Sequence, residues 1–287
     1  MGRPIVLSNG QMFVGLDENG LVHDFYYPYV GLENLTTARS IQHKIGVWVD
    51  GIFRWTDDGT WKIQLAFEDN ALISNILMRS DELGISLQFN DFIDNKHNAF
   101  VRRIYITNHA ESSREVRLFM HQVFQISRSG RADTALYVPE ENYLLDYKGR
   151  YCLLISGKFD DYSDFDQFAV GNYQLEGKSG TFFDAEDGEL SNNPVEHGGV
   201  DSVIRFTKSI EANQTANLDY WIVAASSQND AEKVHISFKN QAMNDRIESV
   251  RKDWNNWLGE SNQTVEIGYR LSLNHSLMII KAHCDER

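Results

Sequence analysis

Residues 61–68 read WKIQLAFE, so an aromatic or aliphatic side chain stands at every second position. The runs ISLQF at 85–89 and VRLFMHQ at 116–122 alternate in the same way. A period of two is typical of a strand with one face in the core and the other in solvent. We therefore expect antiparallel β-strands along this part of the chain.

Turn signals separate these runs from others like them. They are Asp50-Gly51, Asp57-Asp58-Gly59, Asn108-His109, Lys148-Gly149 and Glu176-Gly177-Lys178-Ser179-Gly180. Strands thus recur at roughly 8–12-residue spacing, with no helical pattern between them, as far as about Ala225. Some ten or more strands are too many for one small sheet. We expect two sheets packed in a sandwich.

A helical period replaces the alternation after Ala225. Apolar residues recur three and four apart from Val234 to Leu258, and Asp230 is placed to cap the first helix. A last helix is expected over Ile267–Cys284, and most of its circumference is apolar. Such a helix needs burial on most sides. We therefore expect partner helices beyond this polypeptide, and we interpret the chain as the front part of a larger protein.

The composition excludes several classes of protein. The 287 residues are 42% hydrophobic and 24% charged, which is typical of a globular protein. A formal net charge of -14 disfavours nucleic acid as a partner, because its binding depends on Lys and Arg. No run approaches the roughly 20 apolar residues of a membrane span, and Met1–Gly10 lacks the pattern of a secretion signal. We expect a cytoplasmic protein that binds neither nucleic acid nor membrane.

Metal and cofactor chemistry has little support in the sequence. Cys152 and Cys284 are expected to be buried thiols rather than a disulfide or part of a metal site. The histidines are scattered, and none forms a metal-ligand pattern with a third ligand nearby. Neither a Gly-x-Ser-x-Gly motif nor a glycine-rich phosphate loop is present. We therefore expect no metal and no cofactor.

Short motifs follow one another in a familiar order along nearly the whole chain. They are Gly2-Arg3-Pro4, Gly15-Leu16-Asp17, Val22-His23-Asp24-Phe25-Tyr26-Tyr27-Pro28, Gly46-Val47-Trp48, Phe119-Met120-His121-Gln122, Asp184-Ala185-Glu186-Asp187-Gly188, Asn193-Pro194-Val195-Glu196-His197 and Tyr269-Arg270-Leu271-Ser272-Leu273. With them, the chain resembles the amino-terminal region of prokaryotic glucoamylase-type enzymes of glycoside hydrolase family 15. None of the motifs is itself a catalytic signature.

The resemblance implies a mainly β fold class. It implies an antiparallel β-supersandwich, followed by a helical linker and the first helix of a missing (α/α)6 barrel. The β-supersandwich domain is expected at 1–228, the linker at 229–262, and the truncated start of the helical catalytic barrel at 263–287.

The resemblance also implies an inverting hydrolase that releases glucose from the non-reducing ends of α-glucosides. Inversion requires two carboxyl groups roughly 6.5–9.5 Å apart. In the family both are glutamates of later barrel helices, so we expect no catalytic residue here and no activity from this chain alone. The implied partners are an α-glucoside bound through the full-length enzyme and the missing barrel. Apart from the resemblance, an exposed apolar surface would allow a homodimer.

The aromatic segment from His23 to Tyr29 is the best candidate for a sugar site. Sugars present apolar C–H faces and hydroxyl edges, which rings and carboxylates recognise. The candidate residues, at a substrate entrance or a domain interface, are His23, Asp24, Tyr26, Tyr27 and Tyr29. Alternatively, these rings only pack the β-domain against its neighbours.

The acidic run Asp184–Glu189 places four carboxylates within six residues. It lacks the spacing of an EF-hand loop, and charge-rich turns usually lie at the surface. We expect a solvated loop, in which Asp184, Glu186 and Asp187 are candidates for the same entrance or interface.

Two other functions stay open. The chain could be a free-standing carbohydrate-binding or assembly module, in which case dimerisation would cover the last helix. It could also be a sandwich-fold sugar epimerase. That function requires His121 or His197 to meet an acid such as Glu196 or Asp187 in one pocket.

Overall fold

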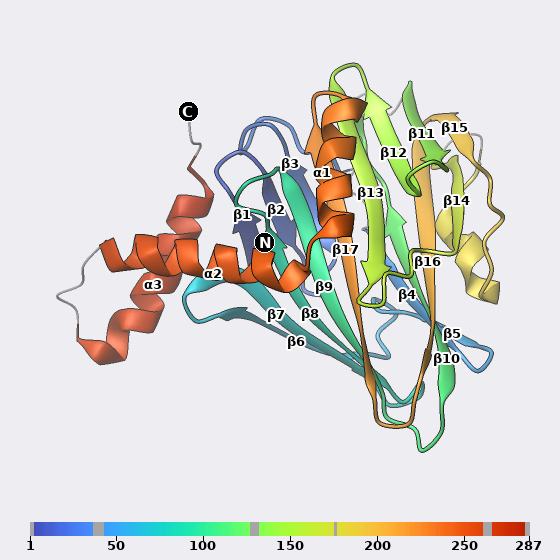
Figure 1. Cartoon of the computed structure of the whole chain (residues 1–287), viewed down its shortest axis with the longest axis horizontal. Coiled ribbons are helices and arrows are strands. Elements are labelled where there is room, and N and C mark those ends of the chain that lie inside the picture. Colours follow the sequence, from blue (N-terminus) through green and yellow to red (C-terminus); the bar gives the residue numbers. More distant parts are fainter. Residues whose placement is uncertain (1–2, 37–42, 127–131, 175–176, 261–265, 285–287) are drawn as a thin grey trace.

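The computed structural model describes residues 3–36, 43–126, 132–174, 177–260 and 266–284. In this part of the chain, three antiparallel sheets precede three α-helices (Figure 1). The helices are α1 (Gln228–Asn240), α2 (Met243–Glu260) and α3 (Ile267–Ala282). None of them is long and apolar enough to cross a membrane.

Two large sheets form the sandwich. The nine-stranded sheet runs in the order β15 (Val195–Gly198), β11 (Asp133–Val138), β12 (Tyr143–Lys148), β13 (Tyr151–Phe159), β17 (Thr215–Ala225), β9 (Ala99–Asn108), β8 (Ile85–Ile93), β7 (Ala71–Ser80) and β6 (Lys62–Glu68). The five-stranded sheet runs in the order β14 (Gln167–Asn172), β16 (Val200–Ile210), β10 (Arg114–Gln122), β4 (Ile45–Val49) and β5 (Ile52–Trp55). The alternating runs in the sequence correctly predicted β6, β8 and β10.

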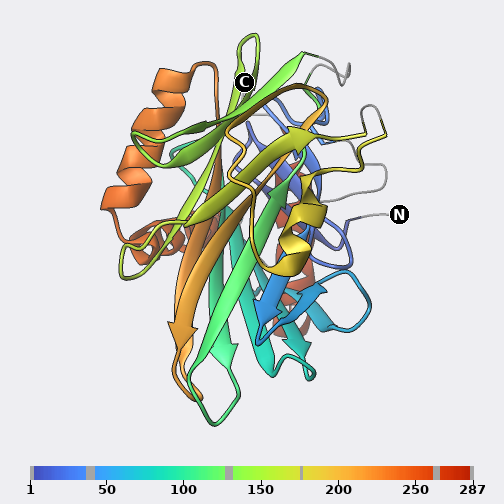
Figure 2. The same ribbon diagram turned by 90° about the vertical axis from the view of Figure 1, so that its right-hand side faces the viewer.

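The main core lies between the two sheets. Phe159 of β13 and Phe206 of β16 meet there edge to face, with ring centroids 6.2 Å apart. Along β10, Leu118 points into this core, while its neighbour Phe119 points to the opposite face. That outer face is covered by the 3-10 helix η2 (Thr181–Asp187), which Figure 2 shows against the five-stranded sheet. Because side chains alternate along a strand, β10 contributes to two apolar layers, one on each face of its sheet.

The helices α1 and α2 cover the outer face of the nine-stranded sheet. Trp221 of β17 packs against Phe238 of α1, with ring centroids 5.7 Å apart. Ala231 and Phe238 of α1 and Val250 of α2 are buried in the same cluster. Ser227 caps α1 by accepting a hydrogen bond from the backbone N–H of Asp230. The predicted capping residue, Asp230, instead lies in the first turn.

The sequence-based prediction for the last helix is wrong. The sequence predicts that residues 263–287 begin a barrel whose other helices are missing. Instead, α3 packs onto the sandwich: Met278 and Ala282 are buried in its main core cluster, and His283 lies 5.0 Å from the ring of Phe13. The expected fold class is therefore corrected to a mainly β sandwich with α-helices at its carboxyl end. Cys152 is buried as predicted, but Cys284 is exposed.

A small sheet lies where α3 meets the sandwich. It contains β1 (Ile5–Ser8), β2 (Phe13–Leu16) and β3 (Val22–Tyr26). Arg102 of β9 ties it to the large sheet, because its guanidinium donates to both carboxylate oxygens of Asp91 in β8 and to the carbonyl of Gly20 at 2.7 Å. Both side chains are almost fully buried. This bidentate pair fixes the position of the β2–β3 turn, and with it the aromatic segment.

Candidate functional site

The aromatic segment runs from β3 into the turn that follows it. A β-bulge at Gly15 and Leu16 shifts the register of β2 with β3, so that Gly15 pairs with Asp24 and Leu16 with Val22. As a result, the consecutive residues His23 and Asp24 are both partly exposed, whereas Val22 and Phe25 are buried. Bulges commonly re-aim side chains in this way.

Arg3 joins His23 and Asp24 into one polar cluster. Its guanidinium donates to Asp24 Oδ2 and to the His23 imidazole. Asn34 Nδ2 donates to the other oxygen of Asp24 at 2.8 Å. Gly15 permits this approach, because a Cβ there would stand 3.0 Å from both Arg3 and Asp24. The sequence points to His23 and Asp24 as site residues but not to Arg3.

Arg3 and Asp24 of this cluster form one wall of a cavity of about 480 Å³, which we call the aromatic-segment pocket. Its main lining residues are Arg3, Phe13, Asp24, Tyr26, Phe67 and His283. The rings of Phe13 and Tyr26 meet edge to face, with centroids 5.8 Å apart. A charged cluster beside aromatic rings is the combination expected for a ligand with hydroxyl edges and apolar faces.

The other two tyrosines of the segment do not line this pocket. Tyr27 packs edge to face on Tyr151 and lines a different cavity, beside the loop of residues 95–98. Burial raises the pKa of Tyr27 above its usual value. Tyr29 lies in the turn and is 43% exposed. The structure therefore brings Asp24 and Tyr26 to one pocket and links His23 to it through Arg3, and it separates Tyr27 and Tyr29 from them.

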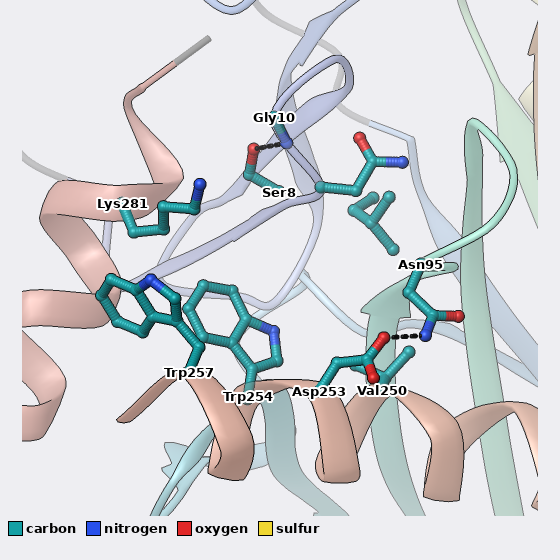
Figure 3. A pocket seen from close by; sticks show the side chains of 10 residues that line it. Ser8, Gly10, Asn95, Val250, Asp253, Trp254, Trp257 and Lys281 are labelled. Carbon is teal, nitrogen blue, oxygen red and sulfur yellow. Dashed lines mark hydrogen bonds between the residues drawn. The ribbon is translucent and has the colours of Figure 1, made fainter. Parts of the chain in front are cut away.

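A second cavity, of about 290 Å³, lies between the β1–β2 turn and α2 (Figure 3). We call it the tryptophan pocket, and its main lining residues are Gly10, Asn95, Asp253, Trp254, Trp257 and Lys281. Lys281 of α3 lines this pocket, and His283, which follows α3, lines the aromatic-segment pocket. From the sequence alone, Trp254 and Trp257 belong only to the apolar stripe of a helix.

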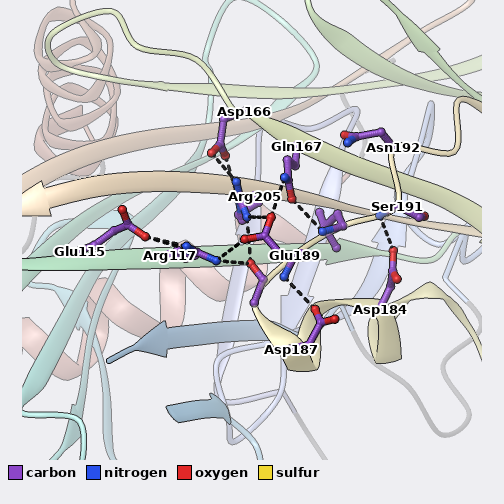
Figure 4. A network of polar contacts seen from close by, with 12 residues as sticks. Glu115, Arg117, Asp166, Gln167, Asp184, Asp187, Glu189, Ser191, Asn192 and Arg205 are labelled. Atoms are coloured by element: carbon purple, nitrogen blue, oxygen red, sulfur yellow. Dashed lines mark hydrogen bonds and ion pairs between the residues drawn. The ribbon is translucent and has the colours of Figure 1, made fainter. Parts of the chain in front are cut away.

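The acidic run folds as η2 and the turn after it, and its carboxylates are engaged (Figure 4). Asp184 and Asp187 accept hydrogen bonds from the backbone N–H groups of Ser191 and Glu189. Glu186 lies within 3.4 Å of the Trp55 indole N–H.

Glu189 forms the centre of an ion-pair network next to η2. It accepts from Gln167, Arg205 and Arg117 at 2.7, 2.8 and 2.6 Å. The hydrogen bond from Gln167 and the contacts with the two arginines lower the pKa of the Glu189 carboxyl.

The acidic run and the aromatic segment are far apart. In Figure 1, η2 lies at the right-hand end of the molecule, whereas β3 lies near its middle. Asp184 and Asp187 hold the turn after η2, and Glu186 links η2 to Trp55 of β5. They form no common site with His23, Asp24 and Tyr26.

The epimerase arrangement does not form around His121 either. His121 is fully buried, and its Nε2 lies 3.0 Å from Asp201, which also accepts from the backbone N–H of Thr181. His197 and Glu196 lie on β15, in the other large sheet, where His197 Nδ1 contacts the Thr134 hydroxyl at 2.9 Å. His121 thus meets neither Glu196 nor Asp187.

One further charged cluster was missed from the sequence. Asp219 of β17 stands opposite Arg103 of β9, whose guanidinium pairs with Asp219 at 3.3 Å and with Asp160 at 3.1 Å. Burial raises the pKa of Asp219 to about 7, although Arg103 opposes the shift. The only sequence signal was Arg102-Arg103 within an otherwise apolar strand. No cluster of three metal-ligand side chains occurs among the described residues.

The chain is similar in sequence to one curated protein and in fold to several solved structures. No protein-family model matches it. An uncharacterized glycosyl hydrolase from Methanocaldococcus jannaschii is 22% identical over 295 aligned residues, which cover 98% of this chain and 45% of the relative. The chain therefore spans about half the length of that relative.

Solved structures share the fold at low sequence identity. A bacterial glucoamylase complexed with acarbose matches with a TM-score of 0.74 at 14% identity, over 98% of this chain and 40% of its own. A family GH92 alpha-mannosidase from Bacteroides thetaiotaomicron matches with a TM-score of 0.51 at 8% identity, over 98% of this chain and 39% of its own. The chain has a glycosyl hydrolase-like fold, and these matches give no support to the predicted barrel helix.

Proposed function

We propose that this chain is a non-catalytic β-sandwich domain of an inverting, glucoamylase-type α-glucoside hydrolase. The observation that carries the proposal is the fold match to a bacterial glucoamylase, with a TM-score of 0.74 over 98% of the chain. The relative described as a glycosyl hydrolase supports the same class of reaction.

The engagement of the carboxylates supports a non-catalytic role. An inverting hydrolase needs one protonated carboxyl and one ionised carboxylate on opposite sides of the bond that breaks. In the aromatic-segment pocket, Asp24 is bound by Arg3 and Asn34. Asp219, whose pKa is raised by burial, and its neighbour Asp160 are both held by the single guanidinium of Arg103. Such pairing keeps both groups from acting on a ligand.

Within this proposal, the aromatic-segment pocket is the part of the domain that contacts substrate or the neighbouring part of the enzyme. Its rings suit the apolar face of a glucose unit, and the Arg3–Asp24 pair suits its hydroxyls. Tyr26, which lines the pocket, is the residue to test first; Tyr29, which is exposed in the next turn, is the matched control.

The test measures glucose released from maltose, maltooligosaccharides and trehalose. We expect none from this chain, and we expect release by the full-length M. jannaschii relative but not by its aligned segment. In that relative, Ala at the position aligned with Tyr26 should raise KM, and Ala at the position aligned with Tyr29 should not. Glucose release by this chain that Asp219→Asn abolishes would overturn the non-catalytic assignment. A full-length relative that acts on no α-glucoside would overturn the substrate class.

A further inference from the structure

The tryptophan pocket is built from four separate parts of the chain. The helix α2 presents Asp253, Trp254 and Trp257 on one face, the β1–β2 turn supplies Gly10, and the loop after β8 supplies Asn95. Lys281 reaches it from α3, and Figure 3 shows its side chain above the Trp257 indole. Because each part belongs to an element packed on the sandwich, the cavity is preformed.

Two tryptophan rings form the aromatic walls of the pocket. The Trp254 and Trp257 rings stand nearly perpendicular, at 88°, with centroids 5.6 Å apart. Both side chains pack partly against the main core, so their orientations are fixed. Within the described residues, neither indole N–H donates a hydrogen bond to the protein. Each ring therefore combines an apolar face with a polar edge that can bind a ligand.

A carboxylate is held beside these rings. Asn95 Nδ2 donates to Asp253 Oδ2 and, at 3.0 Å, to the Ser249 hydroxyl. In Figure 3 the Asn95–Asp253 pair lies on the side of the pocket away from Lys281. The amide fixes the orientation of the carboxylate but cannot neutralise it, so Asp253 keeps its capacity to accept hydrogen bonds from hydroxyl groups.

We propose that the tryptophan pocket binds one pyranose ring of a neutral saccharide. The C–H face of the ring stacks on an indole, and hydroxyl groups donate to Asp253. A volume of about 290 Å³ is at the small end for ligand pockets, which suits a single ring.

The charges argue for a neutral ligand. Perpendicular aromatic rings beside a carboxylate also suit a quaternary ammonium group. The lining, however, holds one cationic side chain, Lys281, and one anionic side chain, Asp253, so neither sign of charge predominates there. The proposal shares only the carbohydrate class with the proposed function, and it does not require that the parent protein hydrolyse anything.

The test follows the tryptophan side chains by NMR. The chain has six tryptophans, and each gives one indole N–H signal in a ¹⁵N-labelled sample. Trp254→Phe and Trp257→Phe identify the two signals from the pocket. On titration with methyl α-D-glucopyranoside, these two signals should shift and saturate, while the other four stay in place.

A matched pair of variants tests the carboxylate. Asp253→Asn keeps the size of the side chain but removes its charge, and we expect binding to weaken about tenfold, as for the loss of one charge-assisted hydrogen bond. Asp245→Asn makes the same change in the first turn of α2, outside the pocket, and should leave the affinity unchanged.

Three results would overturn the proposal. The first is the absence of saturable shifts up to about 100 mM sugar, well beyond millimolar affinity. The second is equal weakening by Asp253→Asn and Asp245→Asn. The third is a response to tetramethylammonium without a response to sugar, which would assign the pocket to a cation. Dispersed spectra of each variant establish that it is folded, and none of these results depends on glucose release.

Discussion

His235 lies between the nine-stranded sheet and α1, where its two ring nitrogens have different partners. Nδ1 accepts from the Trp221 indole N–H at 3.2 Å, and Nε2 donates to the carbonyl of Glu141 at 3.0 Å. These bonds require a neutral ring, because protonation of Nδ1 would remove the acceptor for Trp221. Burial lowers the pKa of His235 to about 4.

His235 should therefore make the protein less stable in acid. Between about pH 6.5 and pH 4 the unfolded state binds a proton that the folded state does not, so stability falls as the pH falls through this range. One histidine contributes up to about 1.4 kcal/mol per pH unit. Urea unfolding at several pH values should give a smaller acid loss for His235→Gln. The control His197→Gln changes an exposed ring on β15 and should behave like the wild type; the same slope for both variants would contradict the assignment.

Single contacts also explain which site residues could be found from the sequence. His23, Asp24 and Tyr26 stand out because polar and aromatic side chains adjoin in the chain. Arg3 does not, since its contact with Asp24 depends on the bulge at Gly15. Trp254 and Trp257 fit an apolar helix stripe equally well whether they are buried in a core or line a cavity. Only the position of the β1–β2 turn opposite α2 distinguishes the two cases.

At the scale of single elements, the start of α1 depends on one side chain. Ser227 is the N-cap, and its hydroxyl also bonds to the Asp230 carboxylate at 2.7 Å. Ser227→Ala should lower the free energy of unfolding by about 1 kcal/mol, because a backbone N–H loses its partner. Ser226→Ala, one residue earlier and exposed, is the matched control and should change stability little. Equal losses in thermal or urea unfolding would contradict the capping role.

The buried ion pair between Asp91 of β8 and Arg102 of β9 should contribute more to stability than the helix cap does. Arg102→Leu leaves Asp91 buried without its cation and releases the β2–β3 turn at Gly20. We expect a loss of about 3–5 kcal/mol, as for breaking other buried pairs. Arg79→Leu removes, at the end of β7, an exposed partner of Asp81 in the turn that follows, and it should change stability little. Similar losses for both variants in urea unfolding would show that Arg102 has no special role.

Elements differ in how far the sequence predicts them. The strands β6, β8 and β10 follow from alternation within each run, which is local information. The order of the sheets is not local, because β17 pairs with β9 across more than a hundred residues. The last helix was misassigned for a related reason. Its apolar stripe predicts burial but not the partner, and the partner of Met278 and Ala282 is the sandwich core.

For the whole molecule, the distance between the two sheets depends on Gly157. A Cβ at this position would stand 2.6 Å from the carbonyl oxygen of Asp219 and 2.7 Å from the Phe206 ring in the other sheet. Since backbone cannot move aside as a flexible side chain can, Gly157→Ala should destabilise the protein by about 1–3 kcal/mol. Gly259→Ala in α2 meets no atom within 4 Å and should be neutral or slightly stabilising. If Gly157→Ala left the melting temperature unchanged, the spacing of the two sheets would not depend on this position.

The place of β17 between β13 and β9 also constrains how the chain can fold during synthesis. Until residues 215–225 leave the ribosome, β9 and β13 each present an open edge of unpaired backbone groups. Open edges are templates for pairing with other chains. Pairing over long separations in sequence is also slow. The sandwich closes only when one late strand fills this gap, so chaperones that shield strand edges would have their greatest effect on nascent chains that do not yet include β17.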